Sequence, residues 1–298
     1  MKPLYITTLS GLMLAIMSLG PADAAVRHYV ADLSNSDWQV TEDSPLQCEL
    51  EHEIPRYGRV NFVSEASKEL NLKMHMNAMR LPDGYDVASV KSVAPSWWPG
   101  SASYELTEMR MYKQFDSELP KQAAWTLLTE LEKGRHPTFF YQDWYNERDQ
   151  VAVGLSAANF RRQYDAFLSC VSGLLKFSFE DIAYTVLNFN DEDGDLTTEA
   201  KRKLMQVGEY LRYDQDLDLV LIDAYTDAYG AREPNQRLTE ERAEFIKSFF
   251  TERGIDSERI VMVGHGERRH IDSNDDELSR ANNRRVVIQL SKPMLGML

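Results

Sequence analysis

The sequence predicts two domains: a β-rich N-terminal domain with short helices, and a C-terminal α/β sandwich with the order β-α-β-α-β-β. The chain has 298 residues, which is enough for two hydrophobic cores. All five tryptophans and both cysteines lie before residue 171, and none follows. Near residue 176 the hydrophobic pattern changes from period-2 alternation to alternating strands and helices. We therefore place the domains at residues 25–176 and 177–298.

Residues 1–24 are typical of a secretory signal peptide. Lys2 precedes a mostly apolar run from Leu4 to Leu19, and Ala22-Asp23-Ala24 fits the A-x-A cleavage pattern. A transmembrane anchor is the alternative, but a run of about 16 residues is short for a bilayer span. Cleavage would leave Ala25 at the new N-terminus. Because this residue is not a cysteine, no lipid-attachment cysteine would be available there. We expect a soluble mature protein outside the cytoplasm.

The two cysteines, Cys48 and Cys170, are expected to form a disulfide in an oxidising compartment. Two buried free thiols are the alternative. Neither cysteine lies in a C-x-x-C motif, so the sequence contains no motif for a catalytic thiol.

Period-2 alternation in the first half predicts strands at Leu72–Met76 and Tyr104–Tyr112. Apolar residues at helical spacing predict two core-packing helices, at Pro120–Glu132 and Ala157–Leu168. The pair Trp97-Trp98 beside a turn fits either the core or an exposed binding patch.

The second half predicts strands that alternate with helices. The expected strands are 176–189, 217–224, 259–263 and 284–290, and the expected helices are 198–211 and 239–253. This order predicts one sheet covered on a single face by two helices.

Asp227 lies in the loop after the second of these strands, and Arg242 lies in the first turn of the helix expected to follow. A carboxylate can accept hydrogen bonds from an ammonium group, and a guanidinium can bind a carboxylate in bidentate fashion. The helix N-terminus would add its own preference for an anion. The pair therefore fits a zwitterionic, amino-acid-like ligand, although a salt bridge between loop and helix has the same spacing.

A longer string of residues resembles the C-terminal OmpA-like family of peptidoglycan-binding domains. The string comprises Thr226-Asp227, Gly230, Asn235, Leu238-Thr239, Arg242-Ala243, Gly254-Ile255, Arg259-Ile260, Gly264-His265-Gly266-Glu267 and Asn283-Arg284-Arg285-Val286. The resemblance implies that Asp227 and Arg242 hold the diaminopimelate of the peptidoglycan stem peptide. It also implies that Thr226, Asn235, Leu238 and an arginine of the last segment, for which we choose Arg285 over Arg284, line the site.

Two positions depart from this pattern. Ala224-Tyr225 stands where the family usually has Gly-His, and Ser279 replaces a frequent glycine. Neither change removes a charge from the expected site, so the departures concern its shape more than the class of its ligand.

The whole arrangement resembles the MotY family of the sodium-driven flagellar motor. The resemblance implies a periplasmic protein whose N-terminal domain docks on the basal body and works with MotX in the T ring. The C-terminal domain would tie that ring to peptidoglycan and so support the stator units. The resemblance therefore implies a non-enzymatic anchor with no cofactor.

Other classes of function are less consistent with the sequence. The formal net charge of -14 repels nucleic-acid phosphates. His265 and His270 form no zinc motif, and we expect no metal site. A cell-wall hydrolase that uses the C-terminal domain for targeting, or a general envelope-anchoring protein, would fit the same C-terminal residues. A hydrolase needs a catalytic set in 25–176, where acids such as Glu105 and Glu108 form no pattern.

Overall fold

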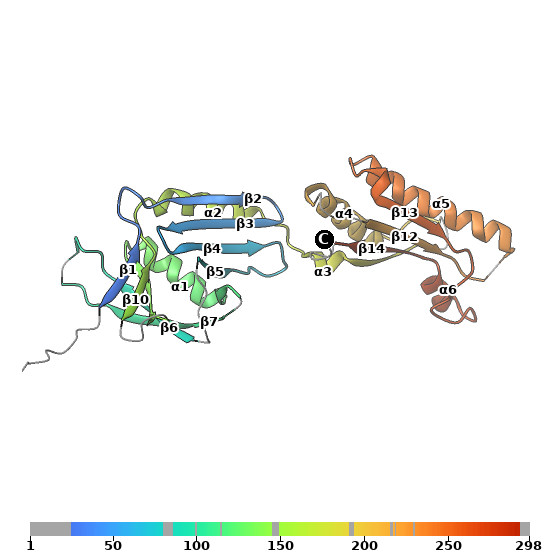
Figure 1. The fold of residues 1–298 in the computed structure, drawn as a ribbon. Coiled ribbons are helices and arrows are strands. Elements are labelled where there is room, and N and C mark those ends of the chain that lie inside the picture. The colour runs from blue at the N-terminus through green and yellow to red at the C-terminus, as the bar shows by residue number, and fades with distance from the viewer. Residues whose placement is uncertain are drawn as a thin grey trace, which may run out of the picture.

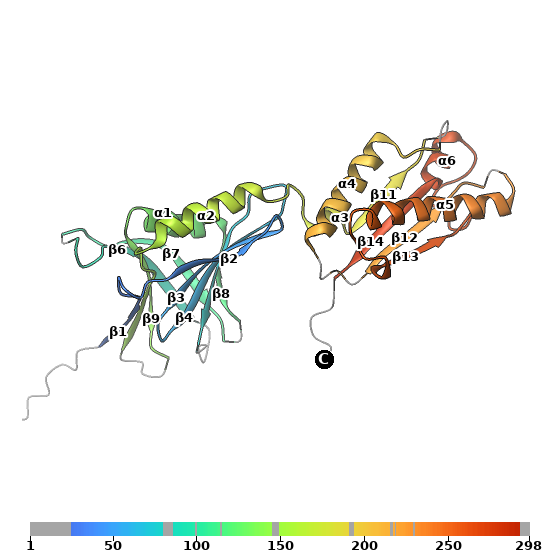
Figure 2. The same cartoon turned by 90° about the horizontal axis from the view of Figure 1, so that it is seen from above.

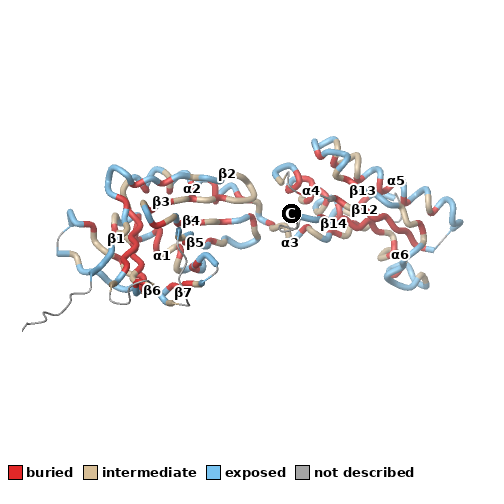
Figure 3. Tube along the Cα trace, viewed as in Figure 1, coloured by how far each residue is buried: buried red, intermediate tan, exposed pale blue. Residues whose placement is uncertain are grey.

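The computed structural model describes residues 25–79, 86–98, 100–113, 115–144, 149–190, 194–214, 217, 219–228 and 230–292. The expected signal peptide therefore lies outside the described residues. Figure 1 shows two parts side by side, the first built from two sheets and two helices and the second from one sheet with helices. Each part has its own cluster of buried hydrophobic residues, visible as two sets of red segments in Figure 3.

Two five-stranded sheets form the N-terminal part. One sheet has the order β1 (Val26–Val30), β10 (Gln150–Gly154), β9 (His136–Gln142), β6 (Asp86–Val93) and β7 (Tyr104–Met111). The other has the order β2 (Trp38–Asp43), β3 (Gln47–Ile54), β4 (Gly58–Glu65), β5 (Lys73–Ala78) and β8 (Ser117–Leu119). The pairings are antiparallel apart from that of β1 with β10.

Both expected helices are present, as α1 (Lys121–Glu132) and α2 (Phe160–Gly173). Their apolar faces join the core shared by the two sheets, because residues such as Leu127 and Phe167 are fully buried there. Trp97 and Trp98 are 57% and 47% exposed, so they belong to the surface and not to this core.

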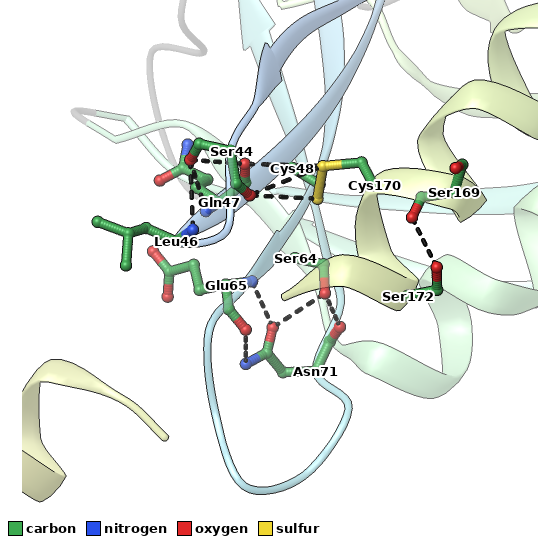
Figure 4. The surroundings of a disulfide bond; sticks show 10 residues. All are labelled: Ser44, Leu46, Gln47, Cys48, Ser64, Glu65, Asn71, Ser169, Cys170 and Ser172. Atoms are coloured by element: carbon green, nitrogen blue, oxygen red, sulfur yellow. Dashed lines mark hydrogen bonds between the residues drawn. A yellow bond between two sulfur atoms is a disulfide. The ribbon is translucent and has the colours of Figure 1, made fainter. Parts of the chain in front are cut away.

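Cys48 on β3 and Cys170 on α2 form the expected disulfide (Figure 4). Their Cα atoms are 5.9 Å apart, and 122 residues separate them in sequence. The bond lies beside the β2–β3 turn, where the Ser44 hydroxyl accepts hydrogen bonds from the amides of Leu46 and Gln47. The disulfide therefore joins α2 to β3, an inner strand of the second sheet that lies much earlier in the chain.

The C-terminal part has one four-stranded sheet in the order β11 (Tyr184–Asn188), β14 (Arg285–Ser291), β12 (Leu219–Tyr225) and β13 (Ile260–Gly264). β12 and β13 run parallel, and β14 runs antiparallel to both of its neighbours. The long helices α4 (Thr198–Tyr213) and α5 (Arg232–Thr251) lie on one face of the sheet and bury Leu204, Ile246 and Phe250 (Figure 2). The α/β sandwich and its β-α-β-α-β-β order are confirmed.

Three short helices were not expected: α3 (Phe179–Ile182), the 3-10 turn Ser257–Arg259 and α6 (Glu277–Asn283). The first corrects the prediction of a single strand at 176–189. Ser178 and Asp181 form a capping box, in which the Ser178 amide donates to Asp181 Oδ2 at 3.0 Å. This cap starts a helical turn and delays the strand until Tyr184.

The segment that joins the two parts is bonded to loops of the N-terminal part. The Leu175 amide donates to the Pro45 carbonyl at 2.9 Å, and the Leu175 carbonyl accepts from Ser67 at 3.1 Å. Lys68 also forms an ion pair with Asp181 of α3. Among the residues that the structure describes, no helix combines the length and hydrophobicity needed to span a membrane.

Removing the disulfide should destabilise the N-terminal part strongly. In the chain-entropy model, closing a loop of this length stabilises the folded state by about 4 to 5 kcal/mol. We expect Cys48→Ser/Cys170→Ser to lose about this free energy in urea unfolding followed by tryptophan fluorescence. All five tryptophans report on this part alone. A change of less than about 1 kcal/mol would contradict the expectation.

His52 is fully buried between the two sheets of the N-terminal part, where its ring stacks on Trp38 at 4.3 Å. One ring nitrogen, Nδ1, lies 2.7 Å from the Asp37 carbonyl, and the Ser156 amide donates to the other, Nε2, at 3.3 Å. This pattern requires a neutral ring with its proton on Nδ1. Burial lowers the pKa of His52 to about 4.

Acidification should therefore weaken the N-terminal part. Between about pH 6.5 and 4 the unfolded chain protonates His52 while the folded chain does not, so stability falls as pH falls, by up to about 3 kcal/mol. We expect His52→Gln to flatten this pH dependence in urea unfolding. His75→Gln, at a partly exposed position, is the control and should keep the full slope.

Candidate functional site

The helix that carries most of the expected site residues begins earlier than predicted. We expected a helix at 239–253 with Arg242 in its first turn, but α5 starts at Arg232, so Arg242 lies almost three turns inside it. Pro234 does not prevent this start, because the amides of the first turn have no partner within a helix. The expected contribution of the helix N-terminus to anion binding at Arg242 is therefore wrong.

The longer helix places Asn235, Thr239 and Arg242 on one buried face, at helical spacing. Leu238 lies beside this face and is 37% exposed. The helix is held against the end of β13: the Gln236 side chain donates to the Gly264 carbonyl at 2.8 Å. A Cβ atom at Gly264 would lie 2.8 Å from the backbone nitrogen of Glu240, so only glycine permits this approach.

Asp227 follows β12 and is bound by Arg284, the residue before β14. Arg284 Nη1 donates to Asp227 Oδ2 at 2.6 Å, and Arg284 Nη2 donates to Glu277 Oε1 on α6 at 2.5 Å. The side chains of Asp227 and Arg284 are only 10% and 11% exposed, so water screens this pair little. Glu277 is 57% exposed and lies at the rim.

Arg242 is 8% exposed, and its guanidinium lies 4.2 Å from the centre of the Phe189 ring. Its Nε and Nη1 atoms are buried and have no hydrogen-bond partner among the residues that the structure describes. Burial and, to a smaller extent, the positive charge of Arg284 lower the pKa of Arg242, Asp227 opposes both, and the resulting pKa is about 10. The three charged groups therefore act on one another, and Arg242 remains cationic at neutral pH.

The backbone around Asp227 is fixed by the loop that follows β13. The Thr226 amide donates to the Gly266 carbonyl at 3.0 Å, and the Gly266 amide donates to Thr239 Oγ1 at 3.0 Å. Asn235 donates to Glu267 Oε2 at 3.3 Å from the same loop. Thr226 is buried, so it supports the loop from inside.

The side chain of Arg285 lies beside Tyr225, whereas that of Arg284 lies beside Asp227. Arg285 is paired in register with Tyr225, and its guanidinium lies 4.2 Å from the centre of that ring. It donates to the Arg269 carbonyl at 3.1 Å. Its neighbour Val286 is in the hydrophobic core, so the alternation of the strand directs Arg285 to the other face of the sheet. Of the two arginines, the structure brings Arg284 to Asp227.

Sequence reasoning missed two residues around Arg242 and Asp227, Phe189 and Glu277, and it considered Arg284 but chose Arg285 instead. The period-2 pattern of Val286, Ile288 and Leu290 could have shown that Arg285 points away from the core. Phe189 and Glu277 come from distant segments and gave no sequence signal.

Together these groups can bind a ligand that carries both charges. Two buried guanidinium nitrogens of Arg242 could donate to a carboxylate that enters the site, and the carboxylate of Asp227 could accept from an ammonium group. Among the described residues, no cluster of three or more His, Cys, Asp or Glu side chains is arranged to hold a metal ion.

Comparison with known proteins matches each of the two parts of the chain to a protein family. The "MotY N-terminal domain" family matches residues 29–176, and the "OmpA family" matches residues 188–284. The "Sodium-type flagellar protein MotY" of Vibrio parahaemolyticus is 40% identical over 284 residues, which cover 95% of this chain and 97% of that protein. The chain belongs to the MotY family.

Membership of the MotY family makes the chain a flagellar protein of the sodium type, with an OmpA-family domain at its C-terminal end. Proteins of the MotY and OmpA families are structural, so the chain is not an enzyme.

More distant matches cover less of the chain. The "Peptidoglycan-associated lipoprotein" of Pseudomonas putida is 31% identical over 126 residues, which cover 42% of this chain and 75% of that protein. The crystal structure of the peptidoglycan-associated lipoprotein from Burkholderia pseudomallei matches with a TM-score of 0.33 at 24% identity, over 36% of this chain and 89% of that one. The C-terminal domain of Helicobacter pylori MotB matches with a TM-score of 0.33 at 15% identity, over 37% of this chain and 86% of that one.

Arg242 should lower the free energy of unfolding of the C-terminal part. A buried guanidinium with unpaired donors has lost water without full replacement, so Arg242→Met should raise the free energy of unfolding of the C-terminal part by about 1 to 3 kcal/mol. Arg259→Met is the matched control, because Arg259 donates to the carbonyls of Leu217 and Asp214. The control should destabilise by about 1 to 3 kcal/mol in denaturation followed by circular dichroism. Equal losses in both variants would contradict this account.

Proposed function

We propose that the C-terminal part binds peptidoglycan through the diaminopimelate of the stem peptide. The observation that carries the proposal is the guanidinium of Arg242, which is buried, has two nitrogens without a partner and lies in the field of Asp227. A free α-carboxylate of diaminopimelate would satisfy those nitrogens, and its α-ammonium would be bound by Asp227.

Thr226, Asn235 and Leu238 would surround the ligand. Thr226 and Asn235 fix the loops on either side of Asp227, and Leu238 offers apolar surface near Arg242. The place of Arg285 in this set stays a prediction. Similarity to a protein named for its association with peptidoglycan supports the ligand class.

We further infer that the protein acts in the periplasm as the wall anchor of the flagellar T ring, after a signal peptide at 1–24 has been removed. Residues 25–176 would dock on the basal body and bind MotX, and residues 177–298 would hold the ring to peptidoglycan, so that stator units assemble around the rotor. The match of nearly the whole chain to a sodium-type flagellar protein supports this role.

Substitution at the site should weaken wall binding without unfolding the protein. In sedimentation with purified peptidoglycan, we expect Asp227→Asn and Arg242→Gln each to weaken binding about 10- to 100-fold, the effect of losing a charge-assisted hydrogen bond. Arg237→Gln, on the exposed side of the same helix, is the control and should bind normally. Full binding by both site variants would refute the proposal, and release of soluble muropeptides would favour the hydrolase alternative.

Motility separates the flagellar role from a general envelope role. We expect deletion of the gene to stop sodium-driven swimming while the envelope stays intact, and the Arg242→Gln gene to restore swimming poorly compared with Arg237→Gln. Swimming speed in soft agar and leakage of a periplasmic enzyme measure the two effects. Normal swimming with a leaky envelope would support an envelope-anchoring protein with no motor function.

A further inference from the structure

The strand β1 begins immediately after the expected signal peptide. It lies at the edge of its sheet and pairs in parallel with β10, from Val26 opposite Gln150 to Val30 opposite Gly154. Its side chains are mostly exposed. The ladder is extended by one bond at its start, where the Gln150 amide donates to the Ala25 carbonyl at 3.0 Å. The backbone of Ala25 therefore takes part in the pairing of β1 with β10.

The backbone amide nitrogen of Ala25 lies beside a carboxylate. It donates to Asp149 Oδ1 at 3.2 Å, and the Asp149 side chain is 16% exposed. The other oxygen of Asp149 lies 3.5 Å from Arg27 Nη2, and Arg27 Nη1 lies 2.8 Å from Asp143 Oδ2. Asp143 is 4% exposed. The start of β1 is thus surrounded by two acids that are largely shielded from water.

We propose that Asp149 is the binding site for the amino terminus that export creates, and that cutting the Ala24–Ala25 bond thereby fixes β1 in its sheet. A hydrolase of the signal-peptidase class would add water to this amide bond. The carbonyl of Ala24 leaves as a carboxylate, and the nitrogen of Ala25 takes up protons to become an α-ammonium. This inference rests on the proposed export and cleavage, and not on wall binding.

Cleavage changes the charge of the nitrogen that Asp149 accepts from. Before the cut, Asp149 accepts from a neutral peptide N–H, and after it from an ammonium, which forms the stronger, charge-assisted bond. The position of the cut matters for the same reason, because one extra residue would move the charge about 3.8 Å along the chain. A strand that has a pairing partner on one side only leaves its sheet readily. The bond between the Ala25 nitrogen and Asp149 therefore affects how often β1 leaves the sheet.

The first experiment finds the amino terminus. The protein is purified from the periplasm of cells that express the full gene, and the mass of its N-terminal peptide is measured. We expect a free amine on Ala25. A chain that starts at any other residue would overturn the proposal, whatever the protein binds.

The second experiment tests the effect of the α-ammonium charge by measuring hydrogen exchange of the β1 amides. Mature protein is compared with protein acetylated at the α-amine near pH 6.5, where lysines are protonated and the α-amine is the more reactive group. Acetylation keeps an N–H on Ala25 and removes its charge, as in the uncut chain. We expect Asp149→Asn to speed exchange of the β1 amides about two- to fivefold in the free-amine protein, and to have a smaller effect after acetylation.

The control variant is Asp165→Asn, an exposed acid on α2 that changes the net charge by the same amount. It should leave β1 exchange unchanged in both forms. An equal effect of Asp149→Asn with and without acetylation would show that Asp149 acts only through Arg27 or the strand. That result, or no effect in either form, would overturn the proposal.

Discussion

The cationic side chain of Arg242 is shielded from water with two of its nitrogens unpaired. Such a group opposes folding, because hydration lost on burial is replaced here only by the face of Phe189 and the field of Asp227. The surrounding structure must therefore supply the stability that this residue removes. The fully buried Ile246 and Phe250, farther along the same helix, do so by anchoring α5 to the sheet. A ligand with a carboxylate is what would complete the site.

Asp227 differs from Arg242, because it already forms an ion pair with Arg284. Arg284 is held between Asp227 and Glu277, so it can exchange one acid for the other. An incoming ammonium would compete with Arg284 for Asp227, and Glu277 would keep the displaced guanidinium paired. The two arginines and the two acids together give the isolated site no net charge. Without the other three residues, Arg242 would leave the site positive.

The sequence predicted the elements better than the contacts of the site. Two strands of the N-terminal part, α1, α2 and the α/β order of the C-terminal part followed from periodicity and capping residues, and the cysteine pair followed from the expected compartment. The start of α5 did not, because Pro234 reads as a helix breaker unless its place in the first turn is known. The choice of Arg285 over Arg284 was wrong for the pairing with Asp227, although the alternation of Val286, Ile288 and Leu290 along β14 indicates that Arg285 points away from the core. Phe189 could not be foreseen, because it meets Arg242 only through the tertiary fold.

The position of the disulfide near the end of α2 affects how the molecule would respond to tension. Cys170 lies three residues before the end of that helix, and the segment that leads to the C-terminal part follows directly. If the two ends of the protein were pulled apart, the helix could unwind from its last turn only as far as Cys170. Beyond that point the force would pass through a covalent bond into β3, and a sheet resists being sheared along many hydrogen bonds at once. The junction therefore has a built-in limit on its extension.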